Sequence, residues 1–212
     1  LVYSGASIGT SELLAKQPYP RYHEGHNGDL FFRWGPKPAP FNLYVRPADV
    51  RKRMAELGDD KAVEIRGLVF SPVAPAGSKA VSIHIPYPGQ APVDYSYSPG
   101  TGTYLRFVEG KPHTDALNNR QLAPANVVVI YAEHKNSDIV EDSLGNVAIL
   151  IKLTGKGRLQ VFRDGVMIEG TWEREEPTQM ARLKDADGQD IPLKPGQTWV
   201  QIVPDTYRLT VQ

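Results

Sequence analysis

The chain has 212 residues, of which 24 are acidic and 24 basic, so its formal net charge is zero. This length suffices for one large domain or two small ones, and 18 prolines with 19 glycines are too many for a helical bundle. The balanced charge gives no indication of a basic nucleic-acid-binding face, so we expect no nucleic-acid partner. Because the chain contains no cysteine, a disulfide, a thiolate nucleophile and a thiolate zinc site are excluded within it.

The first part of the chain mixes helical and strand patterns. Leu1 to Tyr3 predicts a buried strand, and Ser11 to Lys16 a short helix capped by Ser11. Asp29 to Trp34 follows a strand pattern. Pro47 to Leu57 predicts a helix, because proline suits a first helical turn and apolar residues recur at helical spacing before Gly58. No apolar run in the chain reaches the ~18 residues of a membrane-spanning helix.

Strand patterns dominate the rest of the chain. A Pro- and Gly-containing stretch at residues 71–79 is the predicted boundary, and the expected strands then cover 81–85, 95–97, 104–108, 126–132, 147–153, 159–162, 166–173, 199–203 and 207–211. Residues 126–132 and 147–153 are apolar on both faces, which predicts two central strands. Arg163-Asp164-Gly165 is a hairpin turn signature.

These elements predict an α+β fold. We expect a small mixed α/β lobe over residues 1–78 and a larger, predominantly antiparallel β lobe over residues 79–212. The number of strands favours a sandwich or a strongly curved sheet for the second lobe. The first residues read as a strand entering a turn, so we also expect an upstream segment that this sequence does not include.

The best candidate for a polar site is the block from Tyr104 to Leu122, YLRFVEGKPHTDALNNRQL. Alternation along a strand places Tyr104 and Arg106 on one face, which we predict to be polar or partly exposed. The Gly-Lys-Pro turn then returns His113 and Asp115 toward that face. Arginine offers a fork for phosphate or carboxylate, and histidine a proton near neutral pH, so the four residues are the predicted ligand-binding set.

Three interpretations of this block remain open. His113, oriented by Asp115, could serve as a general base, with a site lying in a cleft between the lobes. The two residues could also ligate a metal together with His84 or His134, although nothing in the spacing fixes such a site. The interpretation that we favour is a buried hydrogen-bond network in which Arg106 pairs with Asp115. No cofactor and no metal are expected.

The same block is followed by NVVVIYAEH, by LTGKGRLQVFRDGVMIEGTWERE and by LKDADGQDIPLKPGQTWVQIVP. Together these segments resemble the bacterial YerB-type lipoprotein family, a domain family of unassigned function, over most of residues 95–205. LVYSGAS and PAPFNLYV resemble its N-terminal domain. The family's usual Pro-His-Asn-Leu-Tyr is here Pro40-Phe41-Asn42-Leu43-Tyr44, which removes a histidine. The family's arginine-rich stretch has no counterpart in this sequence.

The resemblance implies a compartment rather than a reaction. We expect an extracytoplasmic protein held at a bacterial membrane by a lipid, with the anchor upstream of this sequence. The favoured function is a non-catalytic module that binds a cell-envelope component, a small anionic ligand or a protein partner. The alternative is an envelope hydrolase or transferase that uses His113, Asp115 and Arg106.

Overall fold

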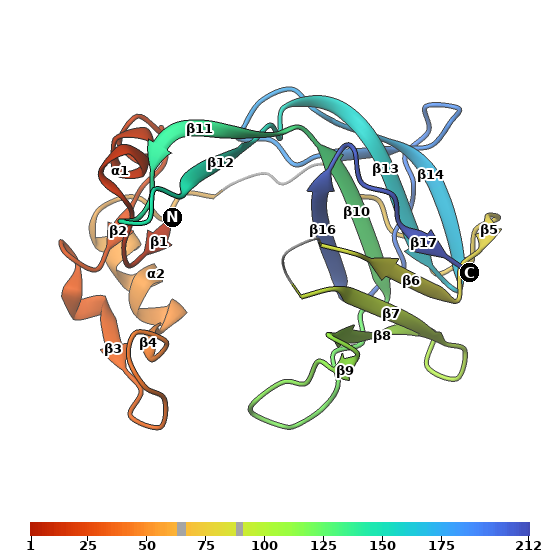
Figure 1. The fold of residues 1–212 in the computed structure, drawn as a ribbon, viewed down its shortest axis with the longest axis horizontal. Coiled ribbons are helices and arrows are strands. Elements are labelled where there is room, and N and C mark those ends of the chain that lie inside the picture. The colour runs from red at the N-terminus through yellow and green to blue at the C-terminus, as the bar shows by residue number, and fades with distance from the viewer. Residues whose placement is uncertain (63–66, 88–90) are drawn as a thin grey trace. The chain divides into compact units, whose positions relative to one another are not determined.

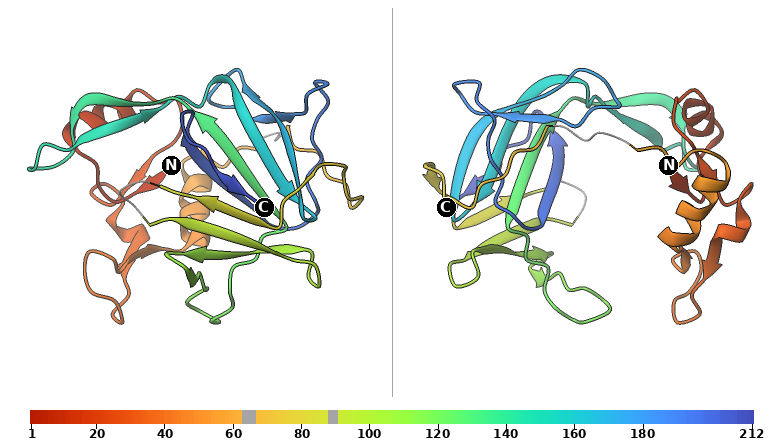
Figure 2. Two further views of the ribbon diagram at one scale, coloured as in Figure 1. Left: turned by 45° about the vertical axis from the view of Figure 1, so that its right-hand side comes forward. Right: turned by 180° about the vertical axis from the view of Figure 1, so that it is seen from behind.

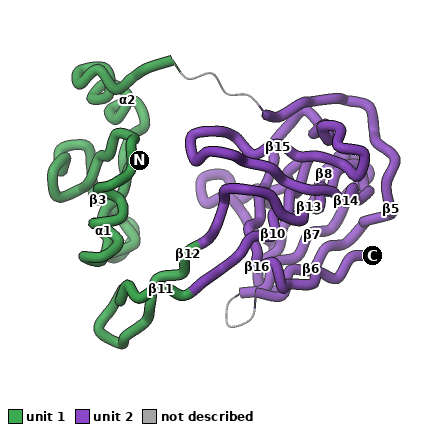
Figure 3. Tube along the Cα trace, turned by 90° about the horizontal axis from the view of Figure 1, so that it is seen from above, with its two compact units in different colours: residues 1–64, 136–150 green, residues 65–135, 151–212 purple. Residues whose placement is uncertain are grey.

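The computed structural model describes residues 1–62, 67–87 and 91–212. By its internal contacts the chain divides into two compact units, residues 1–64 with 136–150 and residues 65–135 with 151–212 (Figure 3). This division differs from the predicted lobes in two places. The stretch around Phe70 belongs to the second unit because it forms a bridge with Leu193. Residues 136–150 belong to the first unit, where Glu141 accepts hydrogen bonds from Ser7 and Thr10.

Short elements surround a small core in the first unit (Figure 1). They are β1 (Val2–Tyr3), α1 (Ile8–Ala15), β2 (Tyr22–His23), the 3-10 turn Gly28–Leu30, β3 (Phe31–Arg33), β4 (Leu43–Val45) and α2 (Pro47–Glu56). β1 pairs with β2 in parallel, and β3 pairs with β4 as an antiparallel hairpin. Tyr22, Leu30 and Val50 are the buried centre.

The predicted helix from Pro47 is confirmed, and Gly58 follows it with a φ of 73°. The other helix starts earlier than expected. α1 begins at Ile8, because the side chain of Ser7 accepts a hydrogen bond from the backbone N–H of Thr10, so Ser7 and not Ser11 is the cap. The first strand was predicted to be buried, but Val2 is 37% exposed.

The second unit contains two larger sheets. One has the order β15-β14-β13-β10-β16, with β5 beside β14, and the other has the order β17-β6-β7-β8-β9. Their strands are β5 (Ser78–Lys79), β6 (Ser82–Ile85), β7 (Val93–Ser98), β8 (Thr103–Val108), β9 (Lys111–Pro112), β10 (Asn126–Ala132), β13 (Gly155–Arg163), β14 (Val166–Arg174), β15 (Arg182–Lys184), β16 (Thr198–Pro204) and β17 (Thr210–Val211). The predicted hairpin at Asp164 joins β13 to β14.

The two sheets of the second unit pack face to face, and β6, β7 and β8 run across β10 and β13 (Figure 2). Their shared core combines side chains of both sheets, including Ile83, Tyr95, Tyr104, Val127, Val129, Tyr131, Phe162 and Val203. All seven residues of β10 are buried, which confirms the predicted central strand. β10 and β16 are parallel, however, so the prediction of an antiparallel lobe was not correct throughout.

The second predicted central strand was wrong. β12 (Val147–Ile151) pairs with β11 (His134–Val140) in a separate two-stranded ribbon, and Ile149 is 57% exposed. With two α-helices and many strands over the described residues, the chain fits the α+β class broadly. Within the same residues, neither helix is long and apolar enough to cross a membrane.

Candidate functional site

The predicted face of β8 is buried rather than polar. Tyr104 and Arg106 do share a face, as alternation required, but Tyr104 is 0% exposed and Arg106 is 7% exposed. The hydroxyl of Tyr104 donates to the carbonyl of Ala80 at 3.0 Å, which places it in the core as a packing residue. The prediction that this face is polar or partly exposed was wrong. Tyr104 and Arg106 point into the core, because β8 packs against the apolar face of β10.

Arg106 has an aromatic surrounding. Its guanidinium carbon lies 4.3 Å from the ring centroid of Trp199 on β16, and its Nε donates to the hydroxyl of Tyr95 at 3.3 Å. The same hydroxyl accepts a hydrogen bond of 2.7 Å from Gln201, which accepts one of 2.7 Å from Tyr87. Over the described residues, no ion pair joins Arg106 to a carboxylate. The π faces and neutral oxygens therefore offset the cost of burying this charge.

His113 is held by Arg106. The Nη1 of Arg106 donates to Nδ1 of His113, whose ring also meets Trp199 edge-on at 6.0 Å between centroids. Burial, followed by the nearby guanidinium charge, lowers the pKa of His113 below its ordinary value. The imidazole is therefore a neutral acceptor at physiological pH, with its proton on Nε2.

Asp115 does not join the other three residues, and the predicted pair with Arg106 is wrong. Its carboxylate accepts a hydrogen bond of 2.7 Å from the backbone N–H of Leu117, and its own N–H donates to the carbonyl of Arg120. Asp115 therefore shapes a surface turn, as aspartate commonly does. A general base oriented by this carboxylate has no geometric support.

The histidines proposed as further metal ligands lie in other contacts. His84 pairs with Asp94 at 2.7 Å, and His134 lies 3.0 Å from the carbonyl of Ala132. Nowhere in residues 1–62, 67–87 and 91–212 do three His, Cys, Asp or Glu side chains gather in a way that could hold a metal ion.

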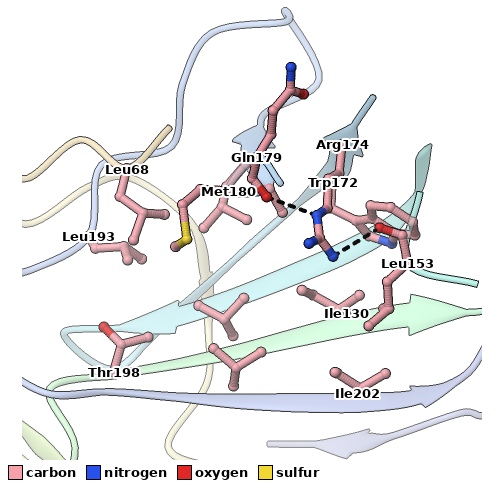
Figure 4. A pocket seen from close by; sticks show the side chains of 14 residues that line it. Leu68, Ile130, Leu153, Trp172, Arg174, Gln179, Met180, Leu193, Thr198 and Ile202 are labelled. Carbon is pink, nitrogen blue, oxygen red and sulfur yellow. Dashed lines mark hydrogen bonds between the residues drawn. The ribbon is translucent and has the colours of Figure 1, made fainter. Parts of the chain in front are cut away.

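A pocket that was not predicted from the sequence lies on the sheet that contains β10 and β16, on the face opposite to Arg106 (Figure 4). Along β16, Trp199, Gln201 and Val203 point to the Arg106 side, while Thr198, Val200 and Ile202 line the pocket. The cavity has a volume of about 290 Å³. Its walls are mainly apolar and comprise Leu68, Val128, Ile130, Leu153, Trp172, Arg174, Gln179, Met180, Ala181, Leu183, Leu193, Thr198, Val200 and Ile202.

One charged side chain, Arg174, borders this pocket (Figure 4). Its Nε donates to the carbonyl of Gln179 at 2.8 Å, and its terminal nitrogens donate to the carbonyls of Pro177 and, weakly at 3.5 Å, of Leu153. All three acceptors are neutral. No carboxylate pairs with Arg174 in the part of the chain that the structure describes, so no ion pair neutralises its charge there.

One signal for the pocket was present in the sequence. Residues of β10 are apolar on both faces, which requires cover on both sides of the sheet. The loop before β15 and the segment at Leu68 supply that cover only in part. Strand periodicity does not report how completely a face is filled, so the cavity itself was not predictable.

Comparison with known proteins places the chain in a family. A family described as "Protein of unknown function (DUF3048) C-terminal domain" matches residues 83–200. A Bacillus subtilis (strain 168) protein named as a candidate lipoprotein, YerB, is 28% identical over 184 residues, covering 84% of this chain and 53% of the relative. The chain thus spans about half the length of this relative.

A solved structure gives the same picture of the fold. The crystal structure of the YerB protein from Bacillus subtilis matches with a TM-score of 0.77 at 24% sequence identity, covering all of this chain and 69% of that chain. The resemblance predicted from the Tyr104 to Leu122 block is thereby confirmed. The chain belongs to the DUF3048 family, the family of the YerB-type bacterial lipoproteins.

Proposed function

We propose that this chain is a non-catalytic binding module of the bacterial cell envelope, and that its pocket takes up the apolar part of a small amphiphilic ligand. The observation that carries the proposal is the open cavity of about 290 Å³ beside β10 and β16. Protein interiors are normally close-packed, and ligand pockets begin at roughly 300 Å³. An apolar cavity of about 150 Å³ already admits benzene.

The charge of Arg174 supports an anionic head on this ligand. The guanidinium contacts only carbonyl oxygens and forms no ion pair within the described residues, so it keeps a net positive charge that attracts a carboxylate or phosphate. An aliphatic or aromatic body with such a head therefore matches both the walls and the border of the pocket. The extracytoplasmic location rests on the relative that is named as a candidate lipoprotein.

The hydrolase or transferase alternative has less support. Its proposed base, His113, has Nδ1 occupied by Arg106, and its proposed orienting residue, Asp115, is engaged in a surface turn. Neither residue lines the cavity. A binding function requires only the pocket.

The proposal is tested by titrating the purified chain with the fluorescent probe N-phenyl-1-naphthylamine. We expect saturable binding, and decanoate should displace the probe more strongly than decanol does. Val200→Lys places a charge in the pocket at a position that is already 49% exposed, and should lower probe affinity about tenfold or more.

The matched control is Val73→Lys. Val73 is 72% exposed in the same unit and does not line the cavity, so this variant should bind the probe as the unchanged chain does. Equal affinities of the two variants, or non-saturable binding, would overturn the pocket assignment. Equal displacement by decanoate and decanol would remove only the anionic head from the proposal.

A further inference from the structure

The loop between β3 and β4, residues 34–42, presents apolar side chains to solvent in the first unit. Residues 33–41 are all exposed, and they include Trp34 at 43% and Phe41 at 77%. Three prolines and an alanine lie between these two aromatic residues. Because an exposed apolar cluster of this kind is unfavourable in water, it indicates an interaction surface.

Hydrogen bonds within the loop and across its base give it a defined conformation. The backbone N–H of Trp34 donates to the carbonyl of Asn42 at 2.8 Å, which closes its base. Within it, the N–H of Lys37 donates to Trp34 and that of Phe41 to Pro38. Arg33 adds a side-chain hydrogen bond to Asn42 at 3.0 Å. The backbone that carries the exposed aromatic residues is therefore ordered by hydrogen bonds within the loop and at its base.

Cations cover the aromatic rings at the base of this loop. The Nζ of Lys37 lies 5.9 Å from the ring centroids of both Trp34 and Tyr44, and the guanidinium of Arg46 lies 4.3 Å from that of Phe32. Flat stacking of a sugar on these rings would require the cations to leave. The surface is better suited to a partner that contacts aromatic edges and positive charges together.

The charges beside the aromatic residues narrow the choice of partner. Arg33 pairs with Glu24 at 3.3 Å and Arg46 with Asp49 at 3.8 Å, whereas Lys37 has no ion pair within the described residues and supplies the unpaired positive charge of this loop. Tryptophan and tyrosine favour the region between lipid headgroups and hydrocarbon, and lysine and arginine favour anionic headgroups. A membrane surface offers both environments at the same depth.

We propose that the β3–β4 loop contacts the surface of an anionic lipid bilayer. Trp34 and Phe41 enter the interfacial region, and Lys37 binds headgroup phosphates. The inference is argued from residues of the first unit and does not depend on the pocket of the second, but it rests on the envelope location of the proposed function. Weak affinity suffices in a lipid-anchored protein, because tethering makes the contact intramolecular.

The test uses the purified chain with vesicles of phosphatidylcholine alone or mixed equally with phosphatidylglycerol, at low and high salt. We expect co-sedimentation with the mixed vesicles only, weakening as salt rises. Brominated lipids should quench the fluorescence of Trp34, which is assigned by its loss in Trp34→Phe because the chain has two other tryptophans.

Matched variants distinguish binding through this loop from non-specific binding to vesicles. Phe41→Ala together with Trp34→Ala should reduce vesicle binding by about tenfold or more, and Lys37→Glu by roughly fivefold or more. Phe70→Ala, at a phenylalanine 56% exposed in the other unit, and Lys111→Glu should leave it unchanged. No binding to mixed vesicles, or equal loss in loop and control variants, would overturn the proposal. Self-association that Phe41→Ala abolishes without lipid would assign the loop to a second copy instead.

Discussion

Arg106 and Trp199 hold the two sheets of the second unit together through a cation–π contact. The guanidinium carbon on β8 lies 4.3 Å from the ring centroid of the indole on β16. Around this pair, Tyr95, Gln201 and His113 complete a connected polar network at the border of the apolar core. The arrangement explains how an arginine that is 7% exposed is retained with no carboxylate partner in the described residues.

This contact predicts measurable coupling between the two residues. Arg106→Met keeps the volume but removes the charge, and Trp199→Leu removes the π face. We expect a coupling energy of roughly 0.5–2 kcal/mol in the free energy of unfolding from a double-mutant cycle in urea. Arg106→Ala should cost more than Arg106→Met, because it also leaves a cavity. Strict additivity of the two single variants would contradict the contact.

The lowered pKa of His113 predicts a dependence of stability on pH. Burial and the charge of Arg106 disfavour the protonated ring in the folded state, so the unfolded chain binds a proton more readily. The contribution of His113 is complete above its unfolded pKa of about 6.5 and is lost as pH falls toward the folded value. The slope from this group is at most about 1.4 kcal/mol per pH unit.

His113→Gln provides the comparison. Urea unfolding between pH 7.5 and pH 5, values chosen to bracket the ordinary histidine pKa of about 6.5, should give a flatter stability curve for this variant. His134→Gln, which removes a histidine outside the network, should retain the slope of the unchanged chain. Parallel curves for the unchanged chain and His113→Gln would show that the ring titrates normally in the folded state.

Alternation and turn chemistry predicted most strands of the second unit, including β10 and the β13–β14 hairpin at Asp164. These two signals failed where the same apolar pattern occurs in a buried strand and in an exposed one. β10 and β12 are both apolar on both faces, but β10 is buried and β12 is exposed. Periodicity reports which side chains share a face, and tertiary packing decides what covers that face.

The candidate site shows the same limit. Tyr104 and Arg106 share a face as predicted, and His113 does return to Arg106 after the turn. Asp115 follows only two residues later, but its carboxylate accepts a hydrogen bond from the backbone of its own loop instead of pairing with Arg106. Residue spacing alone cannot exclude such a local hydrogen bond. Trp199 and Gln201 join the site from β16, about ninety residues away, and no local pattern in the block could have indicated them.

Asp164 at the β13–β14 turn should matter for stability in acid. Burial alone would raise the pKa of its carboxyl, but hydrogen bonds from Lys194 and Arg163, with their charges, outweigh this and hold the pKa below its usual range. Its stabilising contribution is present above the unfolded pKa of about 3.9 and is lost as pH falls through the folded value. Asp164→Asn leaves Arg163, whose side chain is 0% exposed, without its carboxylate.

We therefore expect Asp164→Asn to lower the free energy of unfolding at neutral pH by about 3 kcal/mol, and to flatten the acid limb of the stability curve. Asp187→Asn, at an exposed turn position, should change the free energy by less than about 0.5 kcal/mol. Urea titrations at several pH values measure both effects. An Asp164→Asn variant as stable as Asp187→Asn would show that the ion pairs contribute nothing net.

Gly170 on β14 should tolerate no side chain. A Cβ at this position would lie 1.9 Å from the carbonyl oxygen of Lys184 on the neighbouring β15, and 3.2 Å from Cδ1 of Ile191. Because a backbone oxygen cannot move away without breaking the pairing, Gly170→Ala should cost roughly 2–4 kcal/mol in the free energy of unfolding. It should also release β15, whose Leu183 lines the pocket, and so weaken binding of N-phenyl-1-naphthylamine.

The matched variant is Gly100→Ala. Nothing lies within 4 Å of a Cβ built at Gly100, and that residue does not have a positive φ, so its replacement should shift the free energy by less than about 0.5 kcal/mol. Hydrogen exchange at the amides of β15 separates local release from global loss of structure. Slow exchange there in Gly170→Ala, with unchanged probe affinity, would mean that β14 and β15 absorb the methyl group by shifting together.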